Sequence, residues 1–168
     1  LGHTPVILSS GTQDMHYWEN GIEIFFVRCP SLNLKVKEFN MVAGIFCSSF
    51  AVNRKISELI STRKIDIIQF SSIRSWPLFY YGKVPAIMRL SSYDKLYYRD
   101  YPNKRVVYIQ AFLQRLAARR CVTVFAPSNV HANAFAKDIH RKVSVIESPY
   151  LNEYSKYYDS VYQKKLKD

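Results

Sequence analysis

The sequence predicts an α/β fold in which helices cover a doubly wound, mainly parallel sheet. The chain has 168 residues, of which 48% are hydrophobic, enough to bury one sizeable core. Short apolar runs rich in Val and Ile alternate along the chain with longer stretches of helical periodicity. Strands that alternate with helices in this way pair in parallel, so residues 1–150 are expected to form one domain.

The clearest unit spans residues 120–149 and reads strand, turn, helix, strand. Its first strand, Val122–Phe125, is expected to be buried on both faces, and Pro127 ends it. Ser128 then caps a helix that ends near His140, and Lys142–Ile146 forms a second strand parallel to the first. Such a unit places its loops at the carboxyl ends of the strands, where ligands bind. Ser128 could hold an anion there, although a cap alone is the simpler interpretation.

The rest of the chain divides into elements of the same kinds. Further strands are expected at Pro5–Ser9, Ile22–Arg28, Ile65–Phe70 and Ala86–Leu90. Helices are expected at Phe39–Thr62, where two serines allow a break near Ser48, at Trp76–Tyr81 and at Asn103–Arg120. The stretch Ser10–Gly21 is interpreted as a loop in which His16 could reach a ligand, although a solvated loop histidine is commoner.

Polar side chains follow two of the predicted inner strands. Ser71 and Ser72 come after Phe70, and Ser91, Ser92, Tyr93 and Asp94 come after Leu90. Because the carboxyl ends of parallel strands meet at one edge of a sheet, these residues are expected to converge on a binding crevice. The alternative is that the serines only cap a helix or turn.

The chain is strongly basic. It has 24 Lys and Arg against 13 Asp and Glu, a formal net charge of +11, and residues 101–137 contain no acidic side chain. Such a charge attracts phosphate groups on lipid, nucleic acid or a diphosphate substrate without choosing among them. Tyrosines alternate with basic residues between positions 80 and 105, which predicts a surface facing a membrane or phosphate groups; the candidates are Tyr97, Tyr98, Arg99, Lys104 and Arg105.

Several classes of function are disfavoured. The sequence contains no Asp-x-Asp, and its four histidines lack ligand spacing, so neither a metal nor another cofactor is expected. Cys29, Cys47 and Cys121 are odd in number and far apart, which favours reduced thiols and the cytoplasm. Nothing in the sequence resembles a signal peptide, and the longest mostly apolar run is short of the roughly 20 residues that span a bilayer, so a soluble chain is expected.

Taken in order, several segments resemble the N-terminal, acceptor-side domain of GT-B glycosyltransferases of family four. They read LGHTPVIL, NGIEIFFVRCP, KIDIIQFSS, KVPAIMRLSS and VFAPS followed by KVSVIESP, and they cover nearly the whole chain. The resemblance implies a Rossmann-like fold that lacks its first βα unit. It also implies that residues 151–168 lead towards a C-terminal, donor-binding domain of the same polypeptide.

The resemblance further implies an enzyme that transfers a sugar, with retention, from a nucleotide-sugar donor to a glycan or glycolipid in surface polysaccharide biosynthesis. The chain alone is then expected to be inactive, cytoplasmic or peripheral at the inner face of the membrane, and not to bind nucleic acid. The acceptor-site candidates are His16, Ser71, Ser72, Ser91, Ser92, Tyr93 and Asp94; no catalytic residue is assigned. Ser91 and Gln69 stand where the family often has histidine. The alternatives are a basic nucleic-acid-binding module and a non-catalytic interaction domain.

Overall fold

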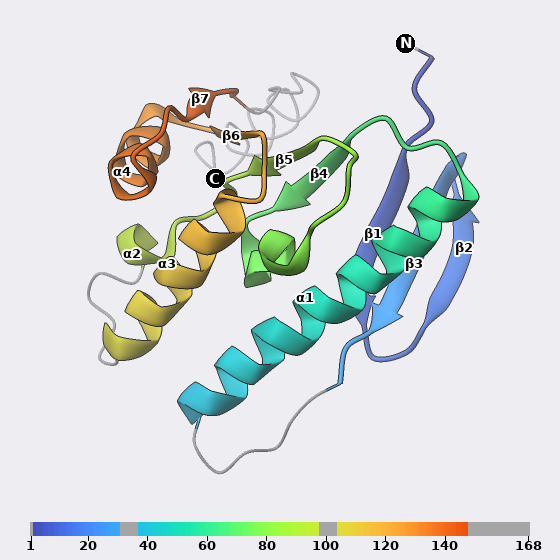
Figure 1. The fold of residues 1–168 in the computed structure, drawn as a ribbon, viewed down its shortest axis with the longest axis horizontal. Helices are drawn as coiled ribbons and strands as arrows, with labels where there is room; N and C mark the ends of the chain where they lie inside the picture. Colours follow the sequence, from blue (N-terminus) through green and yellow to red (C-terminus); the bar gives the residue numbers. More distant parts are fainter. Residues whose placement is uncertain (1, 31–36, 98–103, 148–168) are drawn as a thin grey trace, which may run out of the picture.

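The computed structural model describes residues 2–30, 37–97 and 104–147, and within them the strands form two sheets (Figure 1). The first has the strand order β1-β3-β2, and the second has the order β4-β5-β6-β7. The second sheet is parallel throughout, so the prediction of an α/β fold with a mainly parallel sheet is confirmed. This architecture is compatible with a Rossmann-like fold.

The three-stranded sheet contains β1 (Val6–Gly11), β2 (Met15–Glu19) and β3 (Ile22–Arg28). Strands β1 and β3 are parallel, whereas β2 pairs with β3 in an antiparallel hairpin. Asn20 and Gly21 close that hairpin with positive φ angles of 50° and 76°, the backbone of a tight two-residue turn. The prediction of a loop at Ser10–Gly21 is therefore wrong in part, since this stretch contains β2. All five residues of β2 are exposed, so the strand has no buried face to mark it in the sequence.

The four-stranded sheet contains β4 (Ile68–Ser71), β5 (Ala86–Arg89), β6 (Thr123–Ala126) and β7 (Ser144–Val145). The parallel pairing of β6 with β7 confirms the predicted βαβ unit. Burial alternates along β6: Val124 and Ala126 are fully buried, whereas Thr123 is exposed and the preceding Val122 is 68% exposed. The expectation that this strand is buried on both faces is wrong, because its β-branched character reflects the strand conformation and not burial.

The three long helices follow the predicted pattern, whereas the short helix expected at Trp76–Tyr81 lies at Ile73–Phe79 and the helix Asp94–Tyr97 was not predicted. Helix α1 (Lys37–Thr62) is continuous, and the break allowed near Ser48 does not occur. The two serines are buried without disrupting the helix because each finds a carbonyl acceptor: Ser48 Oγ donates to Ile45 O at 3.1 Å, and Ser49 Oγ donates to Trp76 O at 2.8 Å. The other helices are the 3₁₀ helix η1 (Ile73–Phe79), α2 (Asp94–Tyr97), α3 (Lys104–Ala118) and α4 (Asn129–Ile139).

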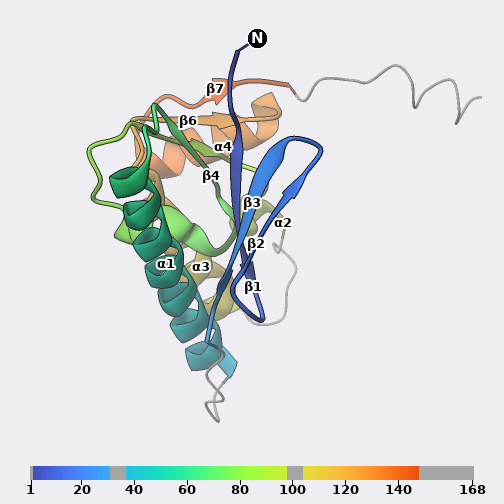
Figure 2. The ribbon, with the colours of Figure 1, turned by 90° about the vertical axis from the view of Figure 1, so that its right-hand side faces the viewer.

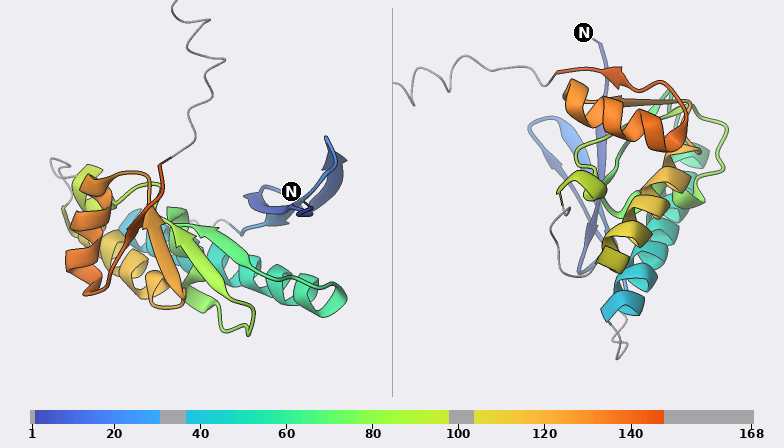
Figure 3. Two further views of the ribbon diagram at one scale, coloured as in Figure 1. Left: turned by 90° about the horizontal axis from the view of Figure 1, so that it is seen from above. Right: turned by 90° about the vertical axis from the view of Figure 1, so that its left-hand side faces the viewer.

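One hydrophobic core joins the four-stranded sheet to the long helices. Met88 and Val124 of the sheet and Phe135 of α4 are fully buried in it, together with residues of α1 and α3. Helices α1 and α3 lie on the same side of this sheet, with η1 between them (Figures 1 and 3). The three-stranded sheet stands beside α1, which contacts β1 and β3 (Figure 2). In the described residues no strand pairing connects the two sheets.

The described residues contain no helix that is both long and apolar enough to cross a membrane. Cys29, Cys47 and Cys121 are free thiols, and Cys121 is buried among apolar residues of the main core. Burial raises the pKa of Cys121 to about 12, so this thiol is protonated and unreactive near neutral pH.

Candidate functional site

Serines at the carboxyl ends of β4 and β5 lie together, as the sequence predicts. Ser71 Oγ is 3.4 Å from Ser91 Oγ, within hydrogen-bond distance. The Ser72 hydroxyl is fully buried; it donates to Ser92 O at 3.1 Å and accepts from Ser91 N at 3.1 Å. Ser72 therefore joins the two loops through its own hydrogen bonds. The interpretation of this serine as a turn-stabilising residue explains all of its contacts.

Tyr93 does not contribute to a crevice, and its assignment as an acceptor-site candidate is wrong. The side chain is 1% exposed, packs edge-to-face on Phe135 and donates its hydroxyl hydrogen bond to Asp138. Lys95 Nζ pairs with the same carboxylate at 2.9 Å. Burial, with the hydrogen bond to Asp138, raises the pKa of Tyr93, so the phenol stays neutral. The tyrosine fixes α2 to α4 and cannot reach a ligand.

A cavity of about 560 Å³ opens beside these serines. It lies between the first half of α1, the start of η1, the segment from the end of β5 to the start of α2, and the middle of α3. Its lining is mixed: α1 and η1 contribute both apolar and polar side chains, and the other elements contribute polar ones. The polar lining residues are Asn40, Arg74, Ser75, Ser92, Asp94, Gln110 and Gln114.

Asp94 is the most distinctive group in this cavity. Burial of its carboxyl raises the pKa above the ordinary value of 3.8. Among the residues that the structure describes, no side chain forms an ion pair or hydrogen bond with this carboxylate. A half-buried carboxylate without a protein partner is less well solvated than it would be in bulk water. It is therefore positioned to accept hydrogen bonds from a ligand that enters the cavity.

Gln114 of α3 holds the loop that carries Asp94. The Gln114 side chain is 3% exposed; its Oε1 accepts from Asp94 N at 3.4 Å, and its Nε2 donates to Ser92 O at 3.3 Å. The amide thus satisfies one backbone donor, at Asp94, and one backbone acceptor, at Ser92. Helix α3 and the end of β5 are fixed relative to each other at the cavity wall.

The opposite wall carries two strained residues. Arg74 and Ser75 have φ angles of 57° and 50°, in the left-handed region that non-glycine residues seldom adopt. Ser75 is almost fully buried and donates its backbone N–H to Ser72 O at 3.3 Å. This bond holds the tight turn that presents the exposed Arg74 to the cavity. Backbone strain of this kind is common at binding sites, where the surrounding fold maintains it.

The sequence therefore indicated only part of this cavity. Ser92 and Asp94 were predicted, whereas Arg74, Gln110 and Gln114 were not. A signal for Gln114 exists, because it lies on the same helical face as Val107 and Ala111, where an apolar residue is expected. Arg74 has no comparable signal, since its position depends on a backbone turn that propensities do not indicate.

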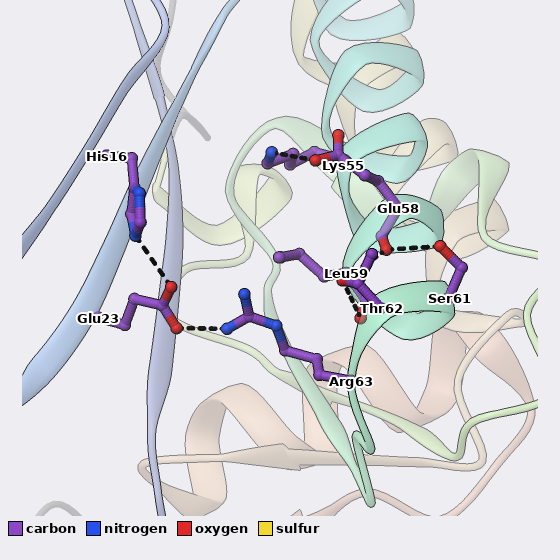
Figure 4. Close-up of polar contacts among 8 residues, drawn as sticks. All are labelled: His16, Glu23, Lys55, Glu58, Leu59, Ser61, Thr62 and Arg63. Atoms are coloured by element: carbon purple, nitrogen blue, oxygen red, sulfur yellow. Dashed lines mark hydrogen bonds and ion pairs between the residues drawn. The ribbon is translucent and has the colours of Figure 1, made fainter.

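His16 lies elsewhere, and its placement in a loop beside the acceptor-site serines is wrong. It belongs to β2, and its Nε2 is 2.9 Å from Glu23 Oε1 on β3 (Figure 4). Arg63, at the end of α1, forms an ion pair with the other oxygen of Glu23. Because the carboxylate has these two partners, Arg63 foremost, its pKa is lowered. His16 and Phe25 also line a second hollow, of about 520 Å³, between this sheet and α1.

The remaining candidates fall into two groups. Ser128 follows β6 at the same edge as the serines, but its side chain caps α4 through His131 N, and it is absent from the cavity lining. Lys104 and Arg105 are exposed at the start of α3. Tyr97 is the last residue of α2, and Tyr98 and Arg99 lie outside the described residues.

In the described ranges, no three His, Cys, Asp or Glu side chains gather closely enough to hold a metal ion. The chain matches no protein-family model and no curated protein sequence.

Proposed function

We propose that the chain is the acceptor-side domain of a retaining GT-B glycosyltransferase and that the cavity beside β4 and β5 receives a hydroxyl-rich acceptor. The resemblance of the strand and loop segments supports the class of enzyme. The parallel four-stranded sheet, with its polar residues at the carboxyl edge, supports the location of the site. In this proposal the sheet and helices belong to a doubly wound Rossmann-like domain.

The Asp94 carboxylate, which has no side-chain partner among the described residues, is the single observation on which the acceptor proposal depends most. Sugar hydroxyls are donors as well as acceptors, and a carboxylate accepts their hydrogen bonds strongly because it is charged. Gln110 supplies an amide group, and Arg74 supplies a donor at the opposite wall. Asp94 thus orients an acceptor hydroxyl, whereas donor binding and group transfer are assigned, by resemblance, to the C-terminal domain.

The test is whether the 168-residue chain binds carbohydrate. Binding is measured from the backbone NMR chemical shifts while the chain is titrated with glucose, galactose, mannose or N-acetylglucosamine. At least one sugar is expected to shift resonances of the cavity residues, including those near Gln110. Asp94→Asn should weaken that binding about tenfold or more, because a hydrogen bond to a charged group is lost. Binding should also weaken as the pH falls and the carboxylate takes up a proton.

Asp66→Asn is the matched control, because that carboxylate is 78% exposed before β4 and does not line the cavity. It should leave the sugar affinity unchanged. If none of the sugars shifts the cavity resonances, or if Asp94→Asn binds as tightly as the wild type, the assignment of this cavity to the acceptor is wrong.

A further inference from the structure

Three phenylalanines form an exposed stripe along the first two-thirds of α1. Phe39, Phe46 and Phe50 are 65%, 40% and 64% exposed. Their spacing of seven and four residues places them on one face of the helix. Large aromatic side chains are seldom left exposed in a row on a helix surface, and an extended apolar surface of this kind marks an interaction site.

The stripe continues across η1 onto α3. The Phe46 and Phe50 rings make edge contacts with Phe79 of η1, with centroids 5.5 Å and 6.5 Å apart. Phe79 and two residues of α3, Ile109 and Leu116, pack against the same small cluster of Ile45, Leu78 and Leu113. The exposed aromatic side chains of α3, Tyr108 and Phe112, lie within one turn of those two residues and are 60% and 49% exposed. We call these aromatic residues of α1, η1 and α3 the aromatic face.

Cations border the aromatic face, and α3 contributes no carboxylate to it. Arg105 and Arg119 are exposed one to two turns from Phe112 on the same side of α3. The Arg115 guanidinium lies 5.7 Å from the centroid of the Phe112 ring. Arg120 lies 4.1 Å from the centroid of the exposed Tyr81 ring and donates to its hydroxyl at 2.7 Å. The face therefore combines apolar rings with a positive rim.

From this combination we infer that the aromatic face docks on the surface of an anionic lipid bilayer. Phenylalanine rings insert at the boundary between headgroups and acyl chains, while arginines beside them bind lipid phosphates. A second copy fits less well, because a symmetric contact would bring the arginines of two α3 helices together. Nucleic acid would use the charge but leave the α1 phenylalanines exposed. This inference does not depend on the proposed function, since it concerns a different surface and a different ligand.

The test is flotation of the 168-residue chain with vesicles of pure phosphatidylcholine and with vesicles containing phosphatidylglycerol. The chain is expected to float with the anionic vesicles, to bind neutral vesicles much more weakly, and to lose affinity as salt increases. The double variant Phe46→Gln, Phe50→Gln should bind at least about tenfold more weakly, because both rings lose their apolar transfer energy. Arg105→Gln and Arg119→Gln should each lower the affinity for anionic vesicles about fivefold, because each removes one cation.

The matched control is the double variant Val130→Gln, Ile146→Gln, which removes apolar side chains that are 67% and 57% exposed on α4 and after β7. It should float like the wild type. Circular dichroism and thermal unfolding establish that each variant is folded, which is expected because the substituted side chains lie at the surface.

Four outcomes would overturn the inference. These are no flotation with anionic vesicles, equal flotation with neutral ones, wild-type flotation of the phenylalanine variant, or an equal loss in the control. If light scattering detects a dimer and the phenylalanine substitutions abolish it, the aromatic face is an interface with a second copy of the chain instead. The chain could instead bind an oligonucleotide in a salt-sensitive way, fail to bind vesicles, and be unaffected by the phenylalanine substitutions. That result would mean that the positive charge serves to bind nucleic acid. Sugar titration of the phenylalanine variant separates this result from the proposed function, because the cavity is left intact.

Discussion

Glu23 in the three-stranded sheet is buried and Asp94 beside the four-stranded sheet is half-buried, yet the two carboxylates have opposite surroundings. Glu23 is 7% exposed and has two cationic or polar partners, His16 and Arg63, which lower its pKa. Asp94 has no such partner in the described part of the chain, and burial raises its pKa. A carboxylate whose charge is compensated stabilises the fold, whereas an uncompensated one destabilises it and favours binding of a ligand.

The two sheets also differ in how they are held. Met88 and Val124 of the four-stranded sheet lie in the main core. In the three-stranded sheet, β1 and β3 pack on α1, and polar contacts supplement this packing: Glu23 bonds to Arg63, and Lys55 and Arg63 lie 5.0 Å and 5.5 Å from the Phe25 ring. Charged contacts of partly exposed groups are weaker than apolar burial. We therefore expect the three-stranded sheet to open before the four-stranded sheet does.

The largest effect is expected from Met88→Ala, since this side chain is completely buried in the main core. The substitution should lower the free energy of unfolding by about 2–5 kcal/mol through lost burial and the cavity that remains. Urea unfolding followed by circular dichroism measures it. Ile7→Ala in β1, where the side chain is 45% exposed, should change stability far less. Equal losses for the two would contradict the proposed difference between the sheets.

A smaller and local effect is expected from Glu23→Gln, which removes the charge that Arg63 neutralises. At pH 7 the amides of β2 and β3 should exchange hydrogen faster, with little change in β5 and β6. Because the folded pKa of Glu23 is below its ordinary value of 4.5, its stabilisation is complete above that pH and is lost as the pH falls through the folded pKa. The difference between variant and wild type should therefore shrink in acid. A uniform increase in exchange across both sheets would disprove a local role.

The smallest effect, and the one of opposite sign, is expected from Asp94→Asn. The raised pKa of Asp94 means that its charge destabilises the folded state at neutral pH, and protonation relieves this as the pH falls towards 3.8. The variant should therefore unfold at a slightly higher temperature than the wild type at pH 7 and at nearly the same temperature below about pH 4. A lower midpoint at pH 7 would mean that the carboxylate has a stabilising partner.

Local pattern predicted most of the strands and helices, although not β2 or α2, but it did not predict which residues come together in a site. Ser72 and Ser92 could be placed at one sheet edge from sequence, because parallel strands align their carboxyl ends. The same reasoning failed for Tyr93, since its position after a strand did not reveal that its ring packs on Phe135. It also failed for His16, whose strand is wholly exposed and therefore has no apolar alternation for periodicity to detect.

By itself the sequence determined an α/β chain with parallel strands, a long first helix and a polar sheet edge that includes Asp94. Only the tertiary structure decided that Gln114 and Arg74 share a cavity with that carboxylate, and that Arg63 reaches Glu23 across 40 residues of chain. The physical reason is that periodicity reports which side of an element is buried, whereas a binding site depends on which elements that side meets.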